Sequence, residues 1–118
     1  MKDKGTQVCI DMVGCSELLL NDITFIEKII SDAIKTAGLT PIDKIKLHKF
    51  EPQGITGYAL LSSSHISIHT WPEFNYASID VFACDKREKV MKAVQVLLDG
   101  LKPTKTKKNI FTRGYIVK

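Results

Sequence analysis

The stretch ITGYALLSSSHISIHTWPEFNYASIDVFAC, residues 55–84, decides the fold because it contains three strand-like segments in a row. Ile66 and Ile68 alternate with polar neighbours, which is the period of a strand with one buried face. We predict strands over 55–62, 64–70 and 76–84, joined between the last two by a hairpin turn at PEFN. A turn centred on Phe74 would place Cys84 directly across from Ser64, with their Cβ atoms about 5 Å apart.

The flanking sequence adds two helices and three further strands. Apolar residues at spacings of three and four predict helices over 21–37 and 86–101, and strands are predicted over 6–13, 42–50 and 109–117. The order is β-α-β-β-β-β-α-β. We therefore predict an α+β fold, a two-layer α/β sandwich whose antiparallel sheet carries two helices on one face. We expect the 118 residues to form a single domain.

The face of the predicted sheet opposite the helices is expected to contact a partner or a ligand. If Ile66 and Ile68 face the helices, the other face still carries Phe50, Trp71 or Phe82. Aromatic side chains gathered on one face indicate a partner subunit or a ligand pocket. We expect a homodimer.

The composition, 44% apolar and 25% charged, is typical of a globular protein. There is no apolar run of membrane-spanning length and no secretory signal at the start, so we expect a cytoplasmic protein that does not bind membranes. Three cysteines without a Cys-x-x-Cys pair indicate free thiols, with Cys9 and Cys15 as buried small side chains. We interpret part of the net charge of +4 as belonging to a solvated connector beside a helix, and we do not expect nucleic acid as a partner. Its residues are Lys102, Lys105, Lys107 and Lys108.

The segment around Ser64 concentrates reactive side chains. His65 and His69 are four residues apart, which on a helix would suggest a zinc pair, but they lie in a strand pattern. His48 has no carboxylate or thiol at ligand spacing, so we expect no metal. By themselves Ser64 and Cys84 are also compatible with a polar hairpin that holds a buried free thiol.

A resemblance to a known family makes the segment specific. FEPQGITG at 50–57, SHISIHTWPE at 64–73 and YASID at 76–80, with Cys84, resemble the short bacterial and archaeal S-adenosylmethionine decarboxylases, which are pyruvoyl enzymes. The resemblance runs in register from about Gly5 to Leu101 and includes DMVGC at 11–15.

The resemblance implies a proenzyme that cuts itself between Ser63 and Ser64 into chains 1–63 and 64–118. The Ser64 hydroxyl would attack the Ser63 carbonyl with help from Thr56, and His69 would remove the Ser64 α-proton. Ser64 would become a pyruvoyl group that forms a Schiff base with the substrate amine. Cys84 would return a proton to the substrate.

The same resemblance implies a binding site for S-adenosylmethionine. Phe50 and His69 would stack on the adenine and Glu73 would bind the ribose. Ile66 and Trp71 are further candidates for lining the site.

Two other functions stay open beside the one that the resemblance implies. Ser63 stands where the family usually has Glu, so a pyruvoyl enzyme acting on arginine or ornithine is the first alternative to an enzyme that supplies spermidine synthesis. A non-catalytic module that binds partners through its lysines is the second.

Overall fold

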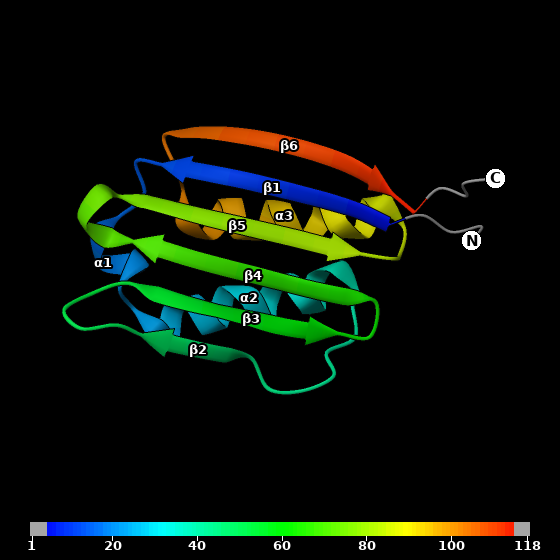
Figure 1. Ribbon diagram of the computed structural model, residues 1–118, viewed down its shortest axis with the longest axis horizontal. Coiled ribbons are helices and arrows are strands. Elements are labelled where there is room, and N and C mark those ends of the chain that lie inside the picture. Colours follow the sequence, from blue (N-terminus) through cyan, green and yellow to red (C-terminus); the bar gives the residue numbers. More distant parts are fainter. Residues whose placement is uncertain (1–4, 115–118) are drawn as a thin grey trace.

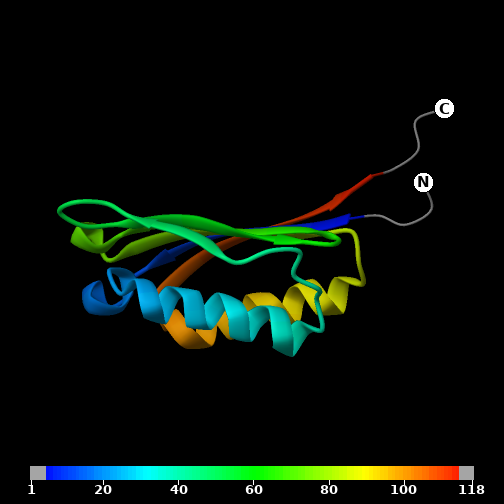
Figure 2. The ribbon, with the colours of Figure 1, turned by 90° about the horizontal axis from the view of Figure 1, so that it is seen from below.

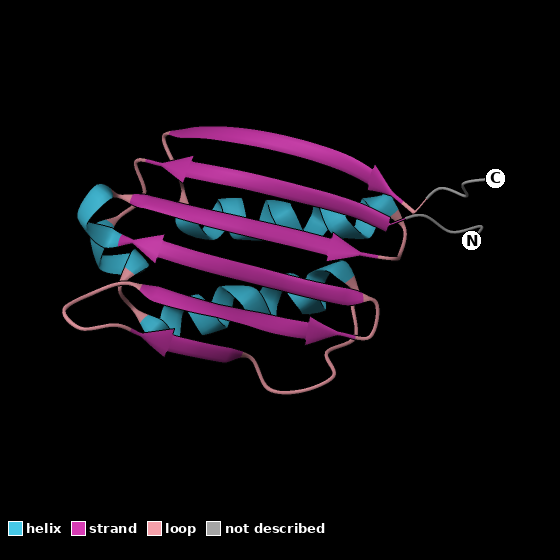
Figure 3. Cartoon of the chain, in the orientation of Figure 1, coloured by secondary structure: helices cyan, strands magenta, loops and turns pink. Residues whose placement is uncertain are grey.

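The computed structural model describes residues 5–114, which form one six-stranded sheet and a layer of helices (Figures 1 and 3). The elements in chain order are β1 (Gly5–Val13), α1 (Glu17–Leu20), α2 (Ile23–Ala37), β2 (Lys46–Lys49), β3 (Ile55–Leu61), β4 (Ser64–Trp71), the 3-10 turn η1 (Pro72–Phe74), β5 (Tyr76–Ala83), α3 (Arg87–Leu101) and β6 (Lys105–Arg113).

The sheet is antiparallel throughout, with strand order β2-β3-β4-β5-β1-β6. Seen from the side, α2 and α3 lie together under one face and leave the other face without helices (Figure 2). The predicted α+β two-layer fold is therefore confirmed, and the core lies between the sheet and the two helices.

Both long helices form where the apolar periodicity predicts them. The Asp22 side chain accepts a hydrogen bond from the Phe25 N–H at the start of α2, and Gly38 ends it with φ of 71°. The apolar stripes of α2 and α3 pack against the sheet, and the side chains of Ile26, Ile30 and Leu97 have no exposed surface. The short helix α1 was not predicted, because four residues are too few for a periodic pattern.

Gly57 allows the edge strand β2 to lie close to β3. A Cβ at this position would come within 2.4 Å of the Lys46 carbonyl oxygen and 2.2 Å of Leu47 Cδ2. Of the strand predicted over 42–50, only Lys46–Lys49 is regular.

The predicted register of the β4–β5 hairpin is wrong by one residue. Ser64 pairs with Ala83 rather than with Cys84, and Trp71 pairs with Tyr76. The loop between the strands thus has four residues rather than an odd number, closed by a 3-10 turn and by Asn75 at φ of 52°. Cys84 consequently lies beside Ser63, whose carbonyl oxygen accepts a hydrogen bond from the Cys84 N–H at 3.0 Å.

The last strand begins earlier than predicted. β6 starts at Lys105 and pairs with β1, so three of the four lysines interpreted as a connector are strand residues. Every residue of β6 is exposed, and an all-polar start such as KTKKN carries no hydrophobic alternation. The end predicted at residues 115–117 lies outside the described residues.

The helix-free side of the sheet, here called the open face, carries the chemically reactive side chains. Along β4 the side chains of Ile66, Ile68 and Thr70 are buried under the helices, so those of His65 and His69 project on the open face. Exposed apolar residues share this face, among them Tyr58, Leu60, Trp71 and Phe111.

Candidate functional site

The candidate residues form two groups near opposite ends of β4. The first group lines a pocket of about 340 Å³, here called the aromatic pocket. It contains five of the residues predicted from sequence, namely Phe50, Thr56, His69, Trp71 and Glu73, together with Gln53, Gly54 and Thr70.

The loop that presents Phe50 is held by hydrogen bonds at its base. The Phe50 N–H donates to the Gly54 carbonyl at 2.8 Å, and the Gly54 N–H donates to the Asn21 side chain at 3.1 Å. Gly54 has φ of 103°, a conformation that favours glycine. The buried Thr70 hydroxyl accepts from the Ile55 N–H and donates to the Leu20 carbonyl. This loop is therefore fixed to both the sheet and the helix layer.

Thr56 and His69 are a directly opposed cross-strand pair. Thr56 Oγ1 lies 3.0 Å from His69 Nδ1, which leaves the Nε2 side of the ring without a partner among the described residues. Next along the open face, the His69 and Trp71 ring centroids are 6.1 Å apart and those of Trp71 and Tyr76 are 5.2 Å apart. The pocket thus combines an imidazole, a hydroxyl and flat aromatic surface.

Glu73 enters the pocket from the η1 turn. Asn75 ties this turn to the segment after β1, because the Asn75 side chain donates to the Cys15 carbonyl at 2.9 Å and the Asn75 carbonyl accepts from the Cys15 N–H at 3.0 Å. The carboxylate is consequently held on a fixed part of the backbone.

The second group lies at the β3–β4 turn and consists of Ser63, Ser64 and Cys84. The Ser63 Oγ is buried and has no hydrogen-bond partner among the described residues. Cys84 is exposed, and a Cβ added to Gly5 would lie 3.5 Å from its Sγ. A peptide carbonyl with a backbone donor, a hydroxyl and a thiol therefore meet at this end of the hairpin.

The two groups do not meet within one chain. His69 lies five positions after Ser64 along β4, which corresponds to about 17 Å of extended strand. Proton transfer needs the two groups within hydrogen-bond reach, about 3 Å. His69 and Thr56 therefore cannot act on the Ser64 of their own chain in this fold.

Ile66 does not line either group with its side chain. Its relative exposure is 0% and it packs in the core between the sheet and the helices. Any contact of Ile66 with a ligand on the open face would have to come from its backbone.

A network that sequence reasoning did not find lies next to Ser64. His65 Nε2 is 2.8 Å from Asp80 Oδ2, and His65 Nδ1 is 3.4 Å from Ser64 Oγ. The Gln7 side chain donates to Asp80 Oδ1 at 2.9 Å, and Cys9 Sγ lies 3.9 Å from the same oxygen. Cys9 is half-buried on the open face, so the prediction that it is buried was wrong. Its partial burial, and then the neighbouring Asp80 carboxylate, raise the pKa of the Cys9 thiol above its ordinary 9.0, so this thiol stays protonated. The one-residue register error concealed the network, because it put Asp80 and His65 on opposite faces.

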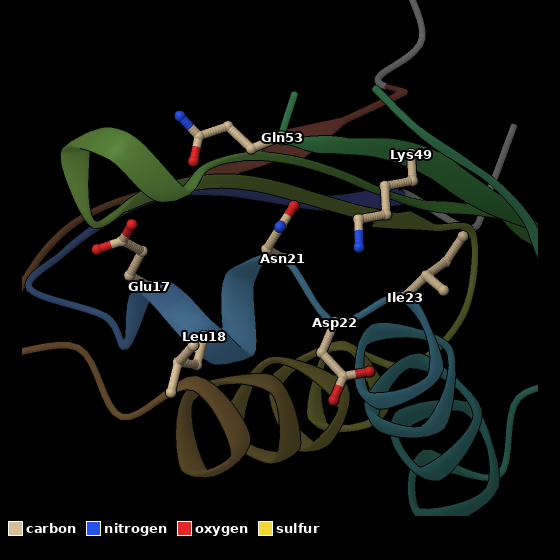
Figure 4. Close-up of a pocket in the computed structure, with 7 residues that line it drawn as sticks. All are labelled: Glu17, Leu18, Asn21, Asp22, Ile23, Lys49 and Gln53. Atoms are coloured by element: carbon tan, nitrogen blue, oxygen red, sulfur yellow. The ribbon is translucent and has the colours of Figure 1, made fainter. Parts of the chain in front are cut away.

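A further pocket, of about 370 Å³, lies between α1, the start of α2 and the loop around Gln53 (Figure 4). Its charged side chains are Glu17, Asp22 and Lys49, and it shares Gln53 with the aromatic pocket. It contains none of the residues predicted from sequence.

Two further observations apply to residues 5–114. No cluster of three His, Cys, Asp or Glu side chains in this part of the chain could hold a metal ion. None of its helices combines the length and the apolarity that a membrane crossing requires.

Comparisons with known proteins point to the same family as the sequence resemblance. Residues 6–114 match the family model described as S-adenosylmethionine decarboxylase. The chain is 45% identical over 116 residues to an S-adenosylmethionine decarboxylase proenzyme of Methanococcus maripaludis, covering 98% of this chain and 94% of that protein. It is 37% identical to the corresponding proenzyme of Clostridium tetani, covering 100% and 97%. The crystal structure of the adenosylmethionine decarboxylase of Aquifex aeolicus superposes with a TM-score of 0.92 at 33% identity, covering 100% of this chain and 97% of that one.

Proposed function

The chain belongs to the S-adenosylmethionine decarboxylase family, and we propose that it is a proenzyme that cuts its own backbone before Ser64 and then decarboxylates S-adenosylmethionine. The product of this reaction is the aminopropyl donor for spermidine synthesis. With three free cysteines, the compartment we propose is the cytoplasm.

The observation that carries the proposal is the hydrogen bond on the carbonyl of the bond to be cut. The Ser63 carbonyl oxygen accepts from the Cys84 N–H at 3.0 Å. When the Ser64 hydroxyl adds to this carbonyl, negative charge develops on that oxygen, and a donor already in place stabilises it. The amide then becomes an ester, and elimination of the ester separates residues 1–63 from 64–118.

The residues at the turn fit a pyruvoyl group made from Ser64. Ser64 is the first residue of β4, and the exposed Cys84 lies beside the bond to be cut. Such a group supplies a carbonyl that withdraws electrons from the substrate carbon as CO₂ leaves. Cys84 is the residue we propose as proton donor to that carbon, because an exposed thiol can both reach the substrate and exchange its proton with water.

A second copy of the chain completes the site in this proposal. The open face carries exposed apolar side chains, and two such faces can pack about 10 Å apart. A two-fold axis between the sheets, crossing over the middle of β4, would exchange the two ends of that strand. The Ser64 end of each β4 would then lie opposite the His69 and Thr56 of the other copy, which removes the separation of about 17 Å along the strand. His69 of one copy would remove the Ser64 α-proton of the other.

The aromatic pocket suits the substrate by its chemistry. Phe50 is 47% exposed although it is a large apolar residue, and its ring meets the His48 ring edge-on at 4.6 Å. An adenine can stack on Phe50 and His69, and the positive sulfonium favours nearby aromatic faces such as Trp71. The Glu73 carboxylate can accept hydrogen bonds from the two ribose hydroxyls.

Ser63 keeps arginine and ornithine open as substrates. The acyl shift uses only the carbonyl of this residue, so a serine in place of glutamate permits cleavage. The aromatic pocket favours S-adenosylmethionine, because neither arginine nor ornithine has a ring to stack there. The exposed lysines of β6 support the non-catalytic binding module.

A decarboxylation assay separates these functions. Cleaved protein is incubated with carboxyl-labelled S-adenosylmethionine, arginine or ornithine, and Ser64→Ala protein is the matched control. We expect labelled CO₂ from S-adenosylmethionine alone and none from the control. Release of labelled CO₂ from arginine or ornithine would identify that amino acid as the substrate in place of S-adenosylmethionine. No release from any of the three by fully cleaved protein would refute the decarboxylase function.

A further inference from the structure

The side chains around Ser64 have the arrangement of a base with its own orienting carboxylate. His65 Nδ1 lies 3.4 Å from Ser64 Oγ, and His65 Nε2 lies 2.8 Å from Asp80 Oδ2. An ionised carboxylate only accepts hydrogen bonds, so the ring proton of a neutral His65 is on Nε2. Nδ1 then carries a lone pair directed at the hydroxyl that must lose its proton.

A chain of contacts across the three strands β5, β1 and β6 holds the carboxylate in place. Asp80 on β5 accepts from Gln7 on β1 at 2.9 Å, and the Gln7 side-chain oxygen accepts in turn from Arg113 on β6 at 2.9 Å. Cys9, also on β1, lies 3.9 Å from the same carboxylate oxygen. Both Gln7 and Cys9 contact Asp80 Oδ1, so Oδ2 is the oxygen that contacts His65.

The ring of His65 is also fixed by its neighbours. Phe82 is its cross-strand partner on β5, and the two rings meet at 63° with centroids 6.0 Å apart. The Arg113 guanidinium lies over the Phe82 ring, with its Cζ 5.3 Å from the ring centroid. On β3 the partner of His65 is Leu60, which cannot ionise. Asp80 is thus the carboxylate that His65 contacts directly.

We infer that His65 removes the proton from the Ser64 hydroxyl in the acyl shift, with Asp80 as its positioning residue. This inference rests on the proposed self-cleavage and assigns the first step to a residue of the same chain. The proton moves from Ser64 Oγ to His65 Nδ1 as Oγ bonds to the Ser63 carbonyl carbon. The bond from that carbon to the Ser64 nitrogen then breaks, and the nitrogen takes the proton back from Nδ1. The step therefore balances without another reactant, and the later elimination by His69 is separate.

The Ser64–His65 separation of 3.4 Å is long for a hydrogen bond to a ring nitrogen. Contacts of catalytic bases are often long before the reactive complex forms and shorten within it. Rotation about the Ser64 Cα–Cβ bond moves Oγ and so changes this distance.

The test follows cleavage of freshly folded protein by intact-mass spectrometry and traps the ester with hydroxylamine. His65→Ala and His65→Gln should slow cleavage at least about 100-fold, the contribution typical of a general base. Both variants should remain amides, so hydroxylamine releases no fragments from them. His69→Ala should instead stop after the acyl shift and yield fragments with hydroxylamine. Added imidazole should partly restore cleavage of His65→Ala.

Asp80→Asn tests the positioning role. An amide can donate to Nε2 and so move the ring proton to Nδ1, which removes the base. We expect slow cleavage of folded Asp80→Asn protein, whereas Asp80→Glu, which keeps a carboxylate acceptor for Nε2, should recover part of the rate. Asp32→Asn, which removes an exposed ion pair on α2, is the matched control and should cleave as the wild type does.

The outcomes separate this inference from the proposed function. Wild-type protein that never cleaves would refute the self-cleavage itself. Wild-type protein that cleaves, with folded His65→Gln or Asp80→Asn cleaving at the same rate, would refute the inference alone. An ester that accumulates in His65→Ala would also refute it, because the acyl shift would then not need this ring.

Discussion

Mixed dimers of two inactive variants should recover self-cleavage if each site is built from two copies. Ser64→Ala removes the nucleophile and His69→Ala removes the base for elimination. Within one chain these residues are about 17 Å apart along β4, against the roughly 3 Å that proton transfer requires. A single chain with one of these changes therefore has no route to complete cleavage.

In a mixed dimer the two changes fall in the same site. The other site combines Ser64 from the His69→Ala chain with His69 from the Ser64→Ala chain, and it is intact. Random association of equal amounts puts about half of the His69→Ala chains into mixed dimers, so about half of these chains should be cut. Ser64→Ala chains should stay whole in every mixture.

The assay is refolding of the two variants together, with different tags, followed by intact-mass spectrometry of each tagged chain. Each variant refolded alone gives the baseline. Capture through one tag must recover the other chain, which establishes that mixed dimers formed. Mixed dimers whose His69→Ala chain is cut no more than its baseline would refute the shared site.

Further consequences concern the aromatic pocket, the edge strand and the thiols. Phe50→Ala should raise the KM for S-adenosylmethionine about 2- to 10-fold through lost stacking, while Phe74→Ala at the exposed turn tip should not; steady-state kinetics compares them. Gly57→Ala should lower the free energy of unfolding by about 1 to 3 kcal/mol because its Cβ would push β2 away, and urea unfolding with an unchanged midpoint would contradict this. Cys84 should be alkylated before Cys15, because Cys84 is exposed whereas burial raises the pKa of Cys15 above its ordinary 9.0; peptide mass spectrometry reads the order. The raised pKa of Cys15 stabilises the fold below pH 9.0, and this contribution is lost as the pH rises through the higher folded-state pKa, which unfolding titrations against Cys15→Ala can measure.

The parts of the fold that bury apolar side chains could be predicted from the sequence. The spacing of Ile66 and Ile68 indicates the buried face of β4, and the spacing of Ile26 and Ile30 indicates the buried face of α2. The start of β6 at Lys105 could not be predicted, because an exposed edge strand gains its order from backbone pairing with β1 and needs no apolar residues.

The site shows the same division. The motif identifies Thr56 and His69 as candidate residues, and in the structure these two residues form a cross-strand pair. The register of β4 on β5 could not, since it depends on the backbone of the Pro72–Asn75 loop, where a change of one residue moves every side chain to the other face. The contact between His65 and Asp80 follows only from the correct register.

Intact-mass spectrometry of the wild-type protein after folding, with and without a hydrazine, tests the central claim most directly. The account predicts two fragments that meet between Ser63 and Ser64, the second without a free amino end and heavier after reaction with hydrazine. A chain that stays full length and does not react with hydrazine would contradict it.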